Sequence, residues 1–149
     1  MPSLAVIRTF LASGETLEFT VSGSSMGKTL PSGSLVRVTA RRPRLGEWVL
    51  YDYGEGAAVH RAVFLRGGLI YQMGDAERAG SWLSPEQTLG TAVAGRRPGA
   101  PWGAETLMVR GFRLLQGWRK LALRRLRGKK PPDDPPAPVP AVDPGLSGN

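Results

Sequence analysis

The 149-residue chain contains no cysteine and only one histidine, His60. Without thiols there is no disulfide framework, no thiolate nucleophile and no Cys-based metal site. No segment approaches the roughly 20 consecutive apolar residues that span a bilayer, and the N-terminus lacks the apolar stretch and small-residue cleavage site of a secretory signal. We therefore expect a cytoplasmic protein that holds no metal and no cofactor.

Acidic residues are scarce in one part of the chain, and that part carries the net charge of +8. Residues 1–95 hold 9 Lys and Arg against 8 Asp and Glu, whereas residues 96–130 hold 11 Lys and Arg and a single acid, Glu105. Few aromatic residues are interleaved with these cations, so the base stacking that single-stranded nucleic acid requires is not expected. An anionic membrane surface is a candidate partner for this segment instead.

Short apolar runs joined by Gly and Pro turns dominate residues 1–95 and are typical of antiparallel β-structure. The pattern predicts a short helix over residues 3–12, followed by six strands at 16–21, 34–39, 48–51, 57–65, 69–73 and 88–94. No helical pattern alternates with the strands, which argues against a parallel α/β sheet. We expect a β sandwich or a partly rolled barrel in this region.

Three further segments follow the β-rich region. Residues 96–103 contain two prolines and predict a linker, residues 104–130 predict a basic amphipathic helix, and residues 131–149 are Pro-rich and predict a disordered tail. One predicted helix face comprises Leu107, Leu114, Leu115, Trp118, Leu121 and Ala122, and the opposite face comprises Arg110, Arg113, Lys120 and Arg124. The apolar face is expected either to pack on the β-rich region or to enter the membrane interface, with the protein peripheral at the inner face.

A turn dense in Gly and Ser, residues 21–33, lies between the first two predicted strands and carries Ser25. Such a turn lets another chain approach closely, and as a hairpin loop it needs no function. A serine hydroxyl attacks a peptide bond only when a neighbouring base takes its proton. His60 is the only imidazole of the chain, and an imidazole of ordinary pKa is neutral yet basic near pH 7. Ser25 and His60 therefore predict a catalytic dyad.

A carboxylate beside the imidazole would extend the dyad to a Ser-His-Asp triad. Asp75 is the first candidate, because it follows the strand predicted to pair by a hairpin with the strand of His60. Asp52, at the end of the third predicted strand, is the second candidate. Lys28 lies only three residues after Ser25 in the same turn, so it is not expected to act as the base.

The sequence around these residues resembles the type I signal peptidases and their relatives. Residues 25–30, Ser-Met-Gly-Lys-Thr-Leu, resemble the family's serine box Ser-Met-x-Pro-Thr-Leu, and residues 45–51 resemble its next box. Residues 59–63, Val-His-Arg-Ala-Val, resemble the His-Arg-apolar box of the archaeal and endoplasmic-reticulum type, in which His replaces the usual Lys base. Residues 71–76 and 89–93 resemble the closing Gly-Asp and Gly-apolar boxes, so five boxes follow in family order.

This resemblance implies a β fold of signal-peptidase type and a serine endopeptidase that removes a leader or signal-like segment from a precursor protein. It implies Ser25 as the nucleophile, His60 as the general base and Asp75 as the acidic partner. The expected oxyanion and substrate-binding residues are Ser24, Ser25 and Met26, with the backbone N–H of Ser25 as one donor. The family's membrane anchor is not found, so the resemblance is to the soluble branch and the expected substrate is a cytoplasmic precursor.

Several positions depart from the family pattern. Lys28 stands where the family has Pro, and Ser34 and Glu47 stand where it often has Asp. Gly23 stands two residues before the nucleophile, where many bacterial members have a hydroxyl that helps to bind the oxyanion. These departures support a second hypothesis, a catalytically inactive β-module that binds extended peptides by adding them to a sheet edge. A third is an adaptor that contacts the membrane surface through residues 104–130.

Overall fold

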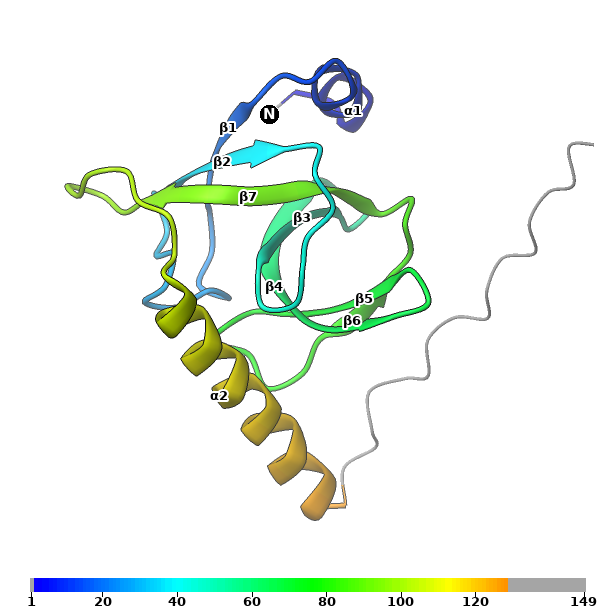
Figure 1. Ribbon diagram of the computed structural model, residues 1–149, viewed down its shortest axis with the longest axis vertical. Helices are drawn as coiled ribbons and strands as arrows, with labels where there is room; N and C mark the ends of the chain where they lie inside the picture. The colour runs from blue at the N-terminus through cyan, green and yellow to red at the C-terminus, as the bar shows by residue number, and fades with distance from the viewer. Residues whose placement is uncertain (1, 129–149) are drawn as a thin grey trace, which may run out of the picture.

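The computed structural model describes residues 2–128, which form a seven-stranded antiparallel sheet and two helices (Figure 1). The helices are α1 (Leu4–Ala12) and α2 (Leu107–Leu126). The strands are β1 (Leu17–Thr20), β2 (Leu35–Thr39), β3 (Trp48–Asp52), β4 (Ala57–Arg66), β5 (Leu69–Met73), β6 (Ser81–Leu83) and β7 (Thr88–Arg96). The predicted mainly β architecture with two terminal helices is confirmed. Residues 129 and 130 of the predicted helix, and the predicted tail at 131–149, lie outside the described residues.

Strand β6 is the one strand of the described chain that the sequence pattern does not predict. Its three residues are too few to show an alternation of apolar and polar side chains. It pairs with β5, where Ser81 lies opposite Gln72. Gly80 precedes it, and a Cβ atom there would lie 1.6 Å from the Gln72 carbonyl oxygen, so only glycine allows this close approach of the two segments.

The last strand in the sequence, β7, lies in the middle of the sheet, whose order is β1-β2-β7-β3-β4-β5-β6. It pairs with β2 on one side and with β3 on the other. It thereby joins the β1–β2 hairpin to the meander that runs from β3 to β6. Ser25 lies in the loop of the hairpin and His60 lies in the meander, so the two main candidate residues belong to different parts of the sheet.

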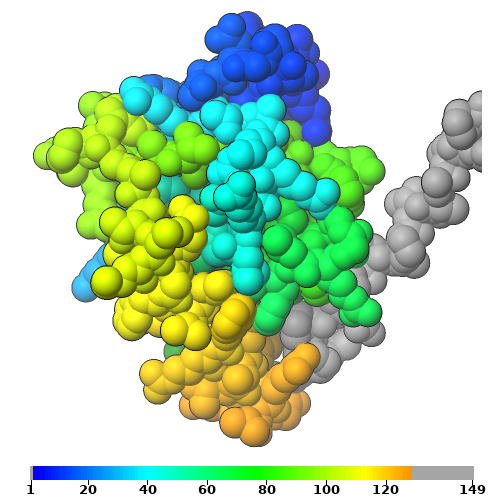
Figure 2. All heavy atoms as spheres, viewed as in Figure 1, coloured from blue at the N-terminus to red at the C-terminus, as the bar shows by residue number. Residues whose placement is uncertain are grey.

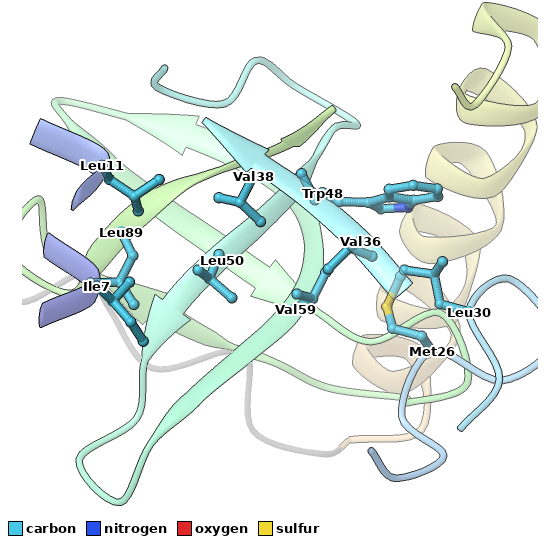
Figure 3. Packing of buried hydrophobic residues seen from close by; sticks show 11 residues of the cluster. Ile7, Leu11, Met26, Leu30, Val36, Val38, Trp48, Leu50, Val59 and Leu89 are labelled. Atoms are coloured by element: carbon cyan, nitrogen blue, oxygen red, sulfur yellow. The ribbon is translucent and has the colours of Figure 1, made fainter. Parts of the chain in front are cut away.

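The main hydrophobic core connects α1 with the loop between β1 and β2 (Figure 3). Ile7 and Leu11 of α1 lie at one end of the cluster, and Met26 and Leu30 of the loop lie at the other end. Between them lie Val36, Val38, Trp48, Leu50, Val59, Leu89 and Ala92. Burial of one large apolar side chain contributes about 1.5–3 kcal/mol. Met26 and Leu30 therefore hold the loop that carries Ser25 against the body of the protein.

Helix α2 packs beside β4 and β5. Gly117 and Leu121 are buried in this contact. The indole Nε1 of Trp118 donates a hydrogen bond of 3.1 Å to the carbonyl oxygen of Val63, and its ring stacks on Phe64 with 6.3 Å between the ring centroids. One side of α2 is thus fixed to the body, which is one of the two arrangements expected for it. Neither helix in residues 2–128 has the length and apolar content that crossing a bilayer requires.

The burial of α2 follows the two predicted faces only in part, with Leu121 buried and Leu114 packed against the same cluster. Leu107 and Leu115 belong to the predicted apolar face, yet they are 79% and 60% exposed. Arg110 belongs to the predicted solvent face, yet its guanidinium lies 3.3 Å from the buried carboxylate of Glu47. Burial alone would raise the pKa of Glu47, but hydrogen bonds from Arg41 and Arg44 and the charges of Arg41 and Arg110 more than offset it, so the pKa is lowered. The carboxylates of the body attract the cations of α2, and several of its apolar side chains are left outside.

The predicted linker, residues 96–103, folds back on the strand that precedes it. Gly95 and Gly103 exchange two backbone hydrogen bonds of 2.8 and 3.0 Å. The guanidinium of Arg37 on β2 lies 4.1 Å from the ring centroid of Trp102, a distance at which cation–π attraction is effective. The connection is therefore tied to the sheet at two points before α2 begins.

Candidate active site

Ser25 and His60 are in hydrogen-bond contact. Ser25 Oγ lies 2.8 Å from His60 Nε2, although the two residues are 35 positions apart in the sequence. Ser25 lies in the β1–β2 loop and is half-buried, and His60 lies on β4 and is 7% exposed. A nucleophile and its base must meet at this kind of distance for a proton to pass between them. The structure brings together the two residues on which the predicted dyad depends.

The Ser25 loop is fixed on both sides of the serine. The carbonyl oxygen of Ser25 accepts a hydrogen bond of 2.8 Å from the backbone N–H of Ala76, and the next side chain, Met26, is buried in the core. A Cβ atom at Gly74 would lie 2.4 Å from the same carbonyl oxygen, so the loop after β5 approaches the serine closely only because residue 74 is glycine. The position of the hydroxyl is thus set by backbone contacts.

The other nitrogen of the imidazole, Nδ1, contacts the side-chain oxygen of Gln72 on β5. The amide nitrogen of Gln72 donates a hydrogen bond of 2.8 Å to Ser81 Oγ on β6, and the amide oxygen lies on the imidazole side. An amide oxygen only accepts, so the proton of the neutral ring lies on Nδ1. Nε2 is then left free to accept the proton of the Ser25 hydroxyl.

Asp75 does not lie at the imidazole, contrary to the prediction. Its two carboxylate oxygens each lie 2.7 Å from a guanidinium nitrogen of Arg61. The reason is the register of β4 with β5. The tight hairpin pairs Arg66 with Leu69, and an unbroken register would bring Asp75 opposite His60, but a bulge at Val63 shifts the pairing by one residue.

After this bulge Ala62 lies opposite Gln72 and Arg61 lies opposite Met73. Side chains two residues apart on a strand share a face, so Gln72 lies on the face of His60 and Asp75 continues the face of Arg61. The second candidate, Asp52, accepts a 2.7 Å hydrogen bond from the N–H of Gly54 and so serves the turn after β3.

Arg61 forms a buried ion cluster behind the site. It is 1% exposed, and besides Asp75 it binds both carboxylate oxygens of Glu105, at 2.8 Å each. It also donates a hydrogen bond of 2.7 Å to the carbonyl oxygen of Gly46. Burial works against the charged guanidinium, but hydrogen bonds and charge from the two carboxylates outweigh it and raise the pKa of Arg61 above its usual value. The cluster connects β4, the loop after β5 and the segment before α2.

Two further residues reach the imidazole and were missed in the sequence. Tyr51 Oη lies 3.2 Å from His60 Nδ1, and a carboxylate oxygen of Glu77 lies 3.8 Å from the same nitrogen. Burial, together with the negative charge of Glu77, raises the pKa of Tyr51 to about 12, so this hydroxyl is neutral near pH 7. Only the strand register, which the sequence pattern does not reveal, places Tyr51 and Gln72 on the face of His60.

Two backbone N–H groups at the nucleophile have no partner in the described part of the chain. Among residues 2–128, the N–H groups of Ser25 and Met26 form no hydrogen bond within the protein. The turn closes around them through other groups, because Gly27 N–H donates to Ser24 at 2.9 Å and Thr29 N–H donates to Met26 at 3.1 Å. Unpaired N–H groups at a serine nucleophile are the groups that form an oxyanion hole. Ser24 itself is exposed.

The arrangement contains a hydroxyl, a base of defined tautomer and two N–H donors, which together suit acyl transfer. Among residues 2–128, no group of three or more His, Asp or Glu side chains is placed to hold a metal ion. Lys28 is exposed in the turn, whereas Lys120 of α2 contacts the carbonyl oxygen of Asp75.

Comparison with protein-family models and with curated proteins finds no match for the chain.

Proposed function

We propose that this protein is a serine endopeptidase of the type I signal peptidase kind, with Ser25 as nucleophile and His60 as general base. The observation that carries the proposal is the 2.8 Å contact between Ser25 Oγ and His60 Nε2. The proposal includes the fold, in which the seven-stranded sheet corresponds to the partly rolled β-barrel of those enzymes. The order of the five sequence boxes supports this assignment.

In the proposed reaction, Ser25 Oγ attacks the carbonyl carbon of the scissile peptide bond while its proton passes to His60 Nε2. The N–H groups of Ser25 and Met26 stabilise the oxyanion of the tetrahedral intermediate. When the C–N bond breaks, Nε2 returns the proton to the departing amine, and an acyl-enzyme remains. Water, deprotonated by the same nitrogen, then releases the acid and restores the hydroxyl.

Gln72 takes the position that an aspartate has in a Ser-His-Asp triad. It holds the tautomer through Nδ1, but as a neutral amide it adds no negative charge. Glu77 supplies a charge 3.8 Å from Nδ1, where it favours the imidazolium formed during the reaction. Orientation and charge compensation are thus divided between two side chains.

The expected substrate is a precursor protein whose leader segment binds in an extended conformation. Both edge strands of the sheet lie at the site: β1 leads into the Ser25 loop, and β6 carries Ser81, which binds Gln72. A free strand edge binds a peptide through backbone hydrogen bonds. The inactive peptide-binding module uses the same edges, so a test must address the hydroxyl itself.

A fluorophosphonate probe provides that test, because it reacts only with an activated serine. We expect the unsubstituted chain to be labelled at Ser25 and the Ser25→Ala variant not to be labelled. Ser22→Ala is the matched control, since it removes another exposed hydroxyl of the same loop, and it should be labelled like the unsubstituted chain. A folded protein that is not labelled, or is labelled equally after Ser25→Ala, would contradict the peptidase proposal and favour the inactive module.

We also propose that the protein contacts an anionic membrane through the outer face of α2. The side chains of Leu107, Met108, Phe112, Leu115 and Leu126 are between 58% and 85% exposed. In Figure 2, α2 is the yellow to orange ridge on the lower part of the surface, and its outer side is uncovered in this view. Residues 96–130 carry 11 Lys and Arg, and a cation near an anionic lipid surface contributes about 1 kcal/mol. Exposed apolar groups among cations are typical of helices that lie in a membrane interface.

Vesicle binding tests this contact. The protein is expected to sediment with phosphatidylcholine vesicles that contain phosphatidylserine, and the Phe112→Glu, Leu115→Glu double variant to bind at least tenfold more weakly, because each side chain loses about 1.5–3 kcal/mol of apolar burial. The control is Phe10→Glu on α1, an exposed aromatic residue on a helix that lies at the other end of the molecule from α2 (Figure 1). Equal binding by the double variant and the control would refute the membrane contact.

A further inference from the structure

A pocket of about 550 Å³ lies between the loop after β5 and the C-terminal half of α2. It is lined by Ala76, Arg78, Lys120, Leu123, Arg124 and Arg127. Four of these six residues are cationic and none is acidic. The pocket therefore gathers positive charge in one concave site, next to a segment that takes part in the candidate active site.

These four cations are not neutralised by the rest of the described chain. Among residues 2–128, Arg78, Lys120, Arg124 and Arg127 take part in no ion pair, whereas Arg61 and others elsewhere are paired. Arg124 Nε is buried without a hydrogen-bond partner in this part of the chain. Like charges around one cavity repel each other, so an anion bound there relieves the repulsion.

The pocket shares its wall with the candidate active site. Ala76 lines the pocket, and its backbone N–H binds the carbonyl oxygen of Ser25 at 2.8 Å. Lys120 contacts the carbonyl oxygen of Asp75, and Glu77, between the pocket residues Ala76 and Arg78, lies 3.8 Å from His60 Nδ1. The pocket therefore adjoins both the loop that carries Ser25 and the segment that reaches the imidazole.

We propose that this pocket is a substrate subsite that binds an acidic side chain, Asp or Glu, near the cleaved bond of the precursor; this rests on the proposed peptidase function. Lys120 and Arg124 donate charge-assisted hydrogen bonds to the carboxylate, which are about twice as strong as neutral ones. Leu123 and the methyl group of Ala76 contact the aliphatic part of the side chain.

The position of the pocket on α2 favours a peptide over a lipid headgroup. At 100° per residue, Lys120 and Arg124 lie on the other side of the helix from Met108 and Leu115, which belong to the exposed apolar face. A membrane that covers the apolar face leaves the pocket turned toward the loop after β5. The precursor reaches this loop whenever it binds at Ser25.

Binding is measured on the full chain with Ser25→Ala, so that the result does not depend on cleavage. The probe is a fluorescein-labelled peptide of four Ala-Glu repeats, compared by fluorescence anisotropy with the same peptide built from Ala-Gln repeats. The first should bind at least tenfold more tightly. Lys120→Gln with Arg124→Gln should remove this preference, and Arg119→Gln with Arg125→Gln is the control, because it removes the same charge from exposed positions of the same helix.

Equal losses in the two double variants would show general electrostatic attraction and overturn the subsite. If the pocket variant does not fold, Arg78→Gln on the loop is used in its place. It should weaken binding of the Ala-Glu peptide at least threefold. Unchanged binding by this variant would overturn the proposal. If binding to phosphatidylserine vesicles requires Lys120 and Arg124, and the Ala-Glu peptide is not preferred over the Ala-Gln peptide, the pocket is a site for a lipid headgroup and not for the substrate. If the protein is not labelled by the fluorophosphonate but still prefers the Ala-Glu peptide, the peptidase proposal is refuted and the pocket remains a binding site for acidic peptides.

Discussion

Replacement of His60 by alanine is expected to slow fluorophosphonate labelling of Ser25 by about 10²–10⁴-fold, the contribution of a positioned general base. Nε2 is 2.8 Å from Ser25 Oγ, and the chain contains no second histidine that could replace it. Without this acceptor the hydroxyl keeps its proton and is a weak nucleophile. The labelling rate at a fixed probe concentration measures the effect.

Tyr51→Phe is the matched control for this experiment. The Tyr51 hydroxyl lies 3.2 Å from Nδ1, on the side of the ring that faces away from Ser25, so its removal disturbs the same buried cluster and leaves Nε2 in place. We expect a change below tenfold for this variant. Circular dichroism shows whether both variants are folded. A folded His60→Ala variant labelled within threefold of the unsubstituted chain would show that His60 is not the base.

The second large effect is expected from Arg61→Met, which should reduce the free energy of unfolding by about 3–5 kcal/mol. Arg61 holds Asp75 and Glu105, whose side chains are each only 6% exposed. The substitution removes the cation that the two buried carboxylates share and leaves Glu105 only the longer contact of 3.8 Å with Arg110 Nε, which is far more costly than the loss of the methylene contacts. Urea unfolding followed by tryptophan fluorescence measures the change.

Glu18→Gln provides the comparison, because Glu18 pairs with Arg37 at 2.9 Å on the surface, where both side chains are more than 40% exposed, and the substitution leaves the contact of Arg37 with Trp102 in place. An exposed pair contributes about 0–1 kcal/mol. Adding Asp75→Asn and Glu105→Gln to Arg61→Met should recover part of the loss, since no unpaired charge remains. A loss below about 1 kcal/mol for Arg61→Met alone would contradict the assigned role of the cluster.

Most helices and strands could be predicted from the sequence, because their apolar and polar patterns depend only on residues that are close together in the chain. Alternation and Gly turns located six strands, and helical periodicity located α1 and α2. Strand β6 was not predicted, because its three residues are too few to show an alternation of apolar and polar side chains. The sides of α2 were predicted correctly for Leu114 and Leu121 but not for Arg110, which faces carboxylates, such as that of Glu47, from distant parts of the chain.

In the candidate site, too, contacts that depend on the pairing of distant segments could not be predicted from the sequence. The order of the sequence boxes was enough to select Ser25 and His60, which the structure places in contact. The partner of Nδ1 depended on a single inserted residue at Val63, which exchanges Asp75 for Gln72 on the face of the imidazole. A bulge in the middle of an apolar strand leaves no signal in composition or periodicity, so residues beyond the dyad required the strand register.

The central position of β7 has a consequence for the timing of activity during synthesis. The ribosome releases the hairpin that bears Ser25 and then the meander that bears His60, but the strand that joins them emerges last. Until residue 96 is free to insert, nothing in the sheet connects nucleophile to base. The proposed peptidase is therefore expected to be inert as a nascent chain until β7 has entered the sheet.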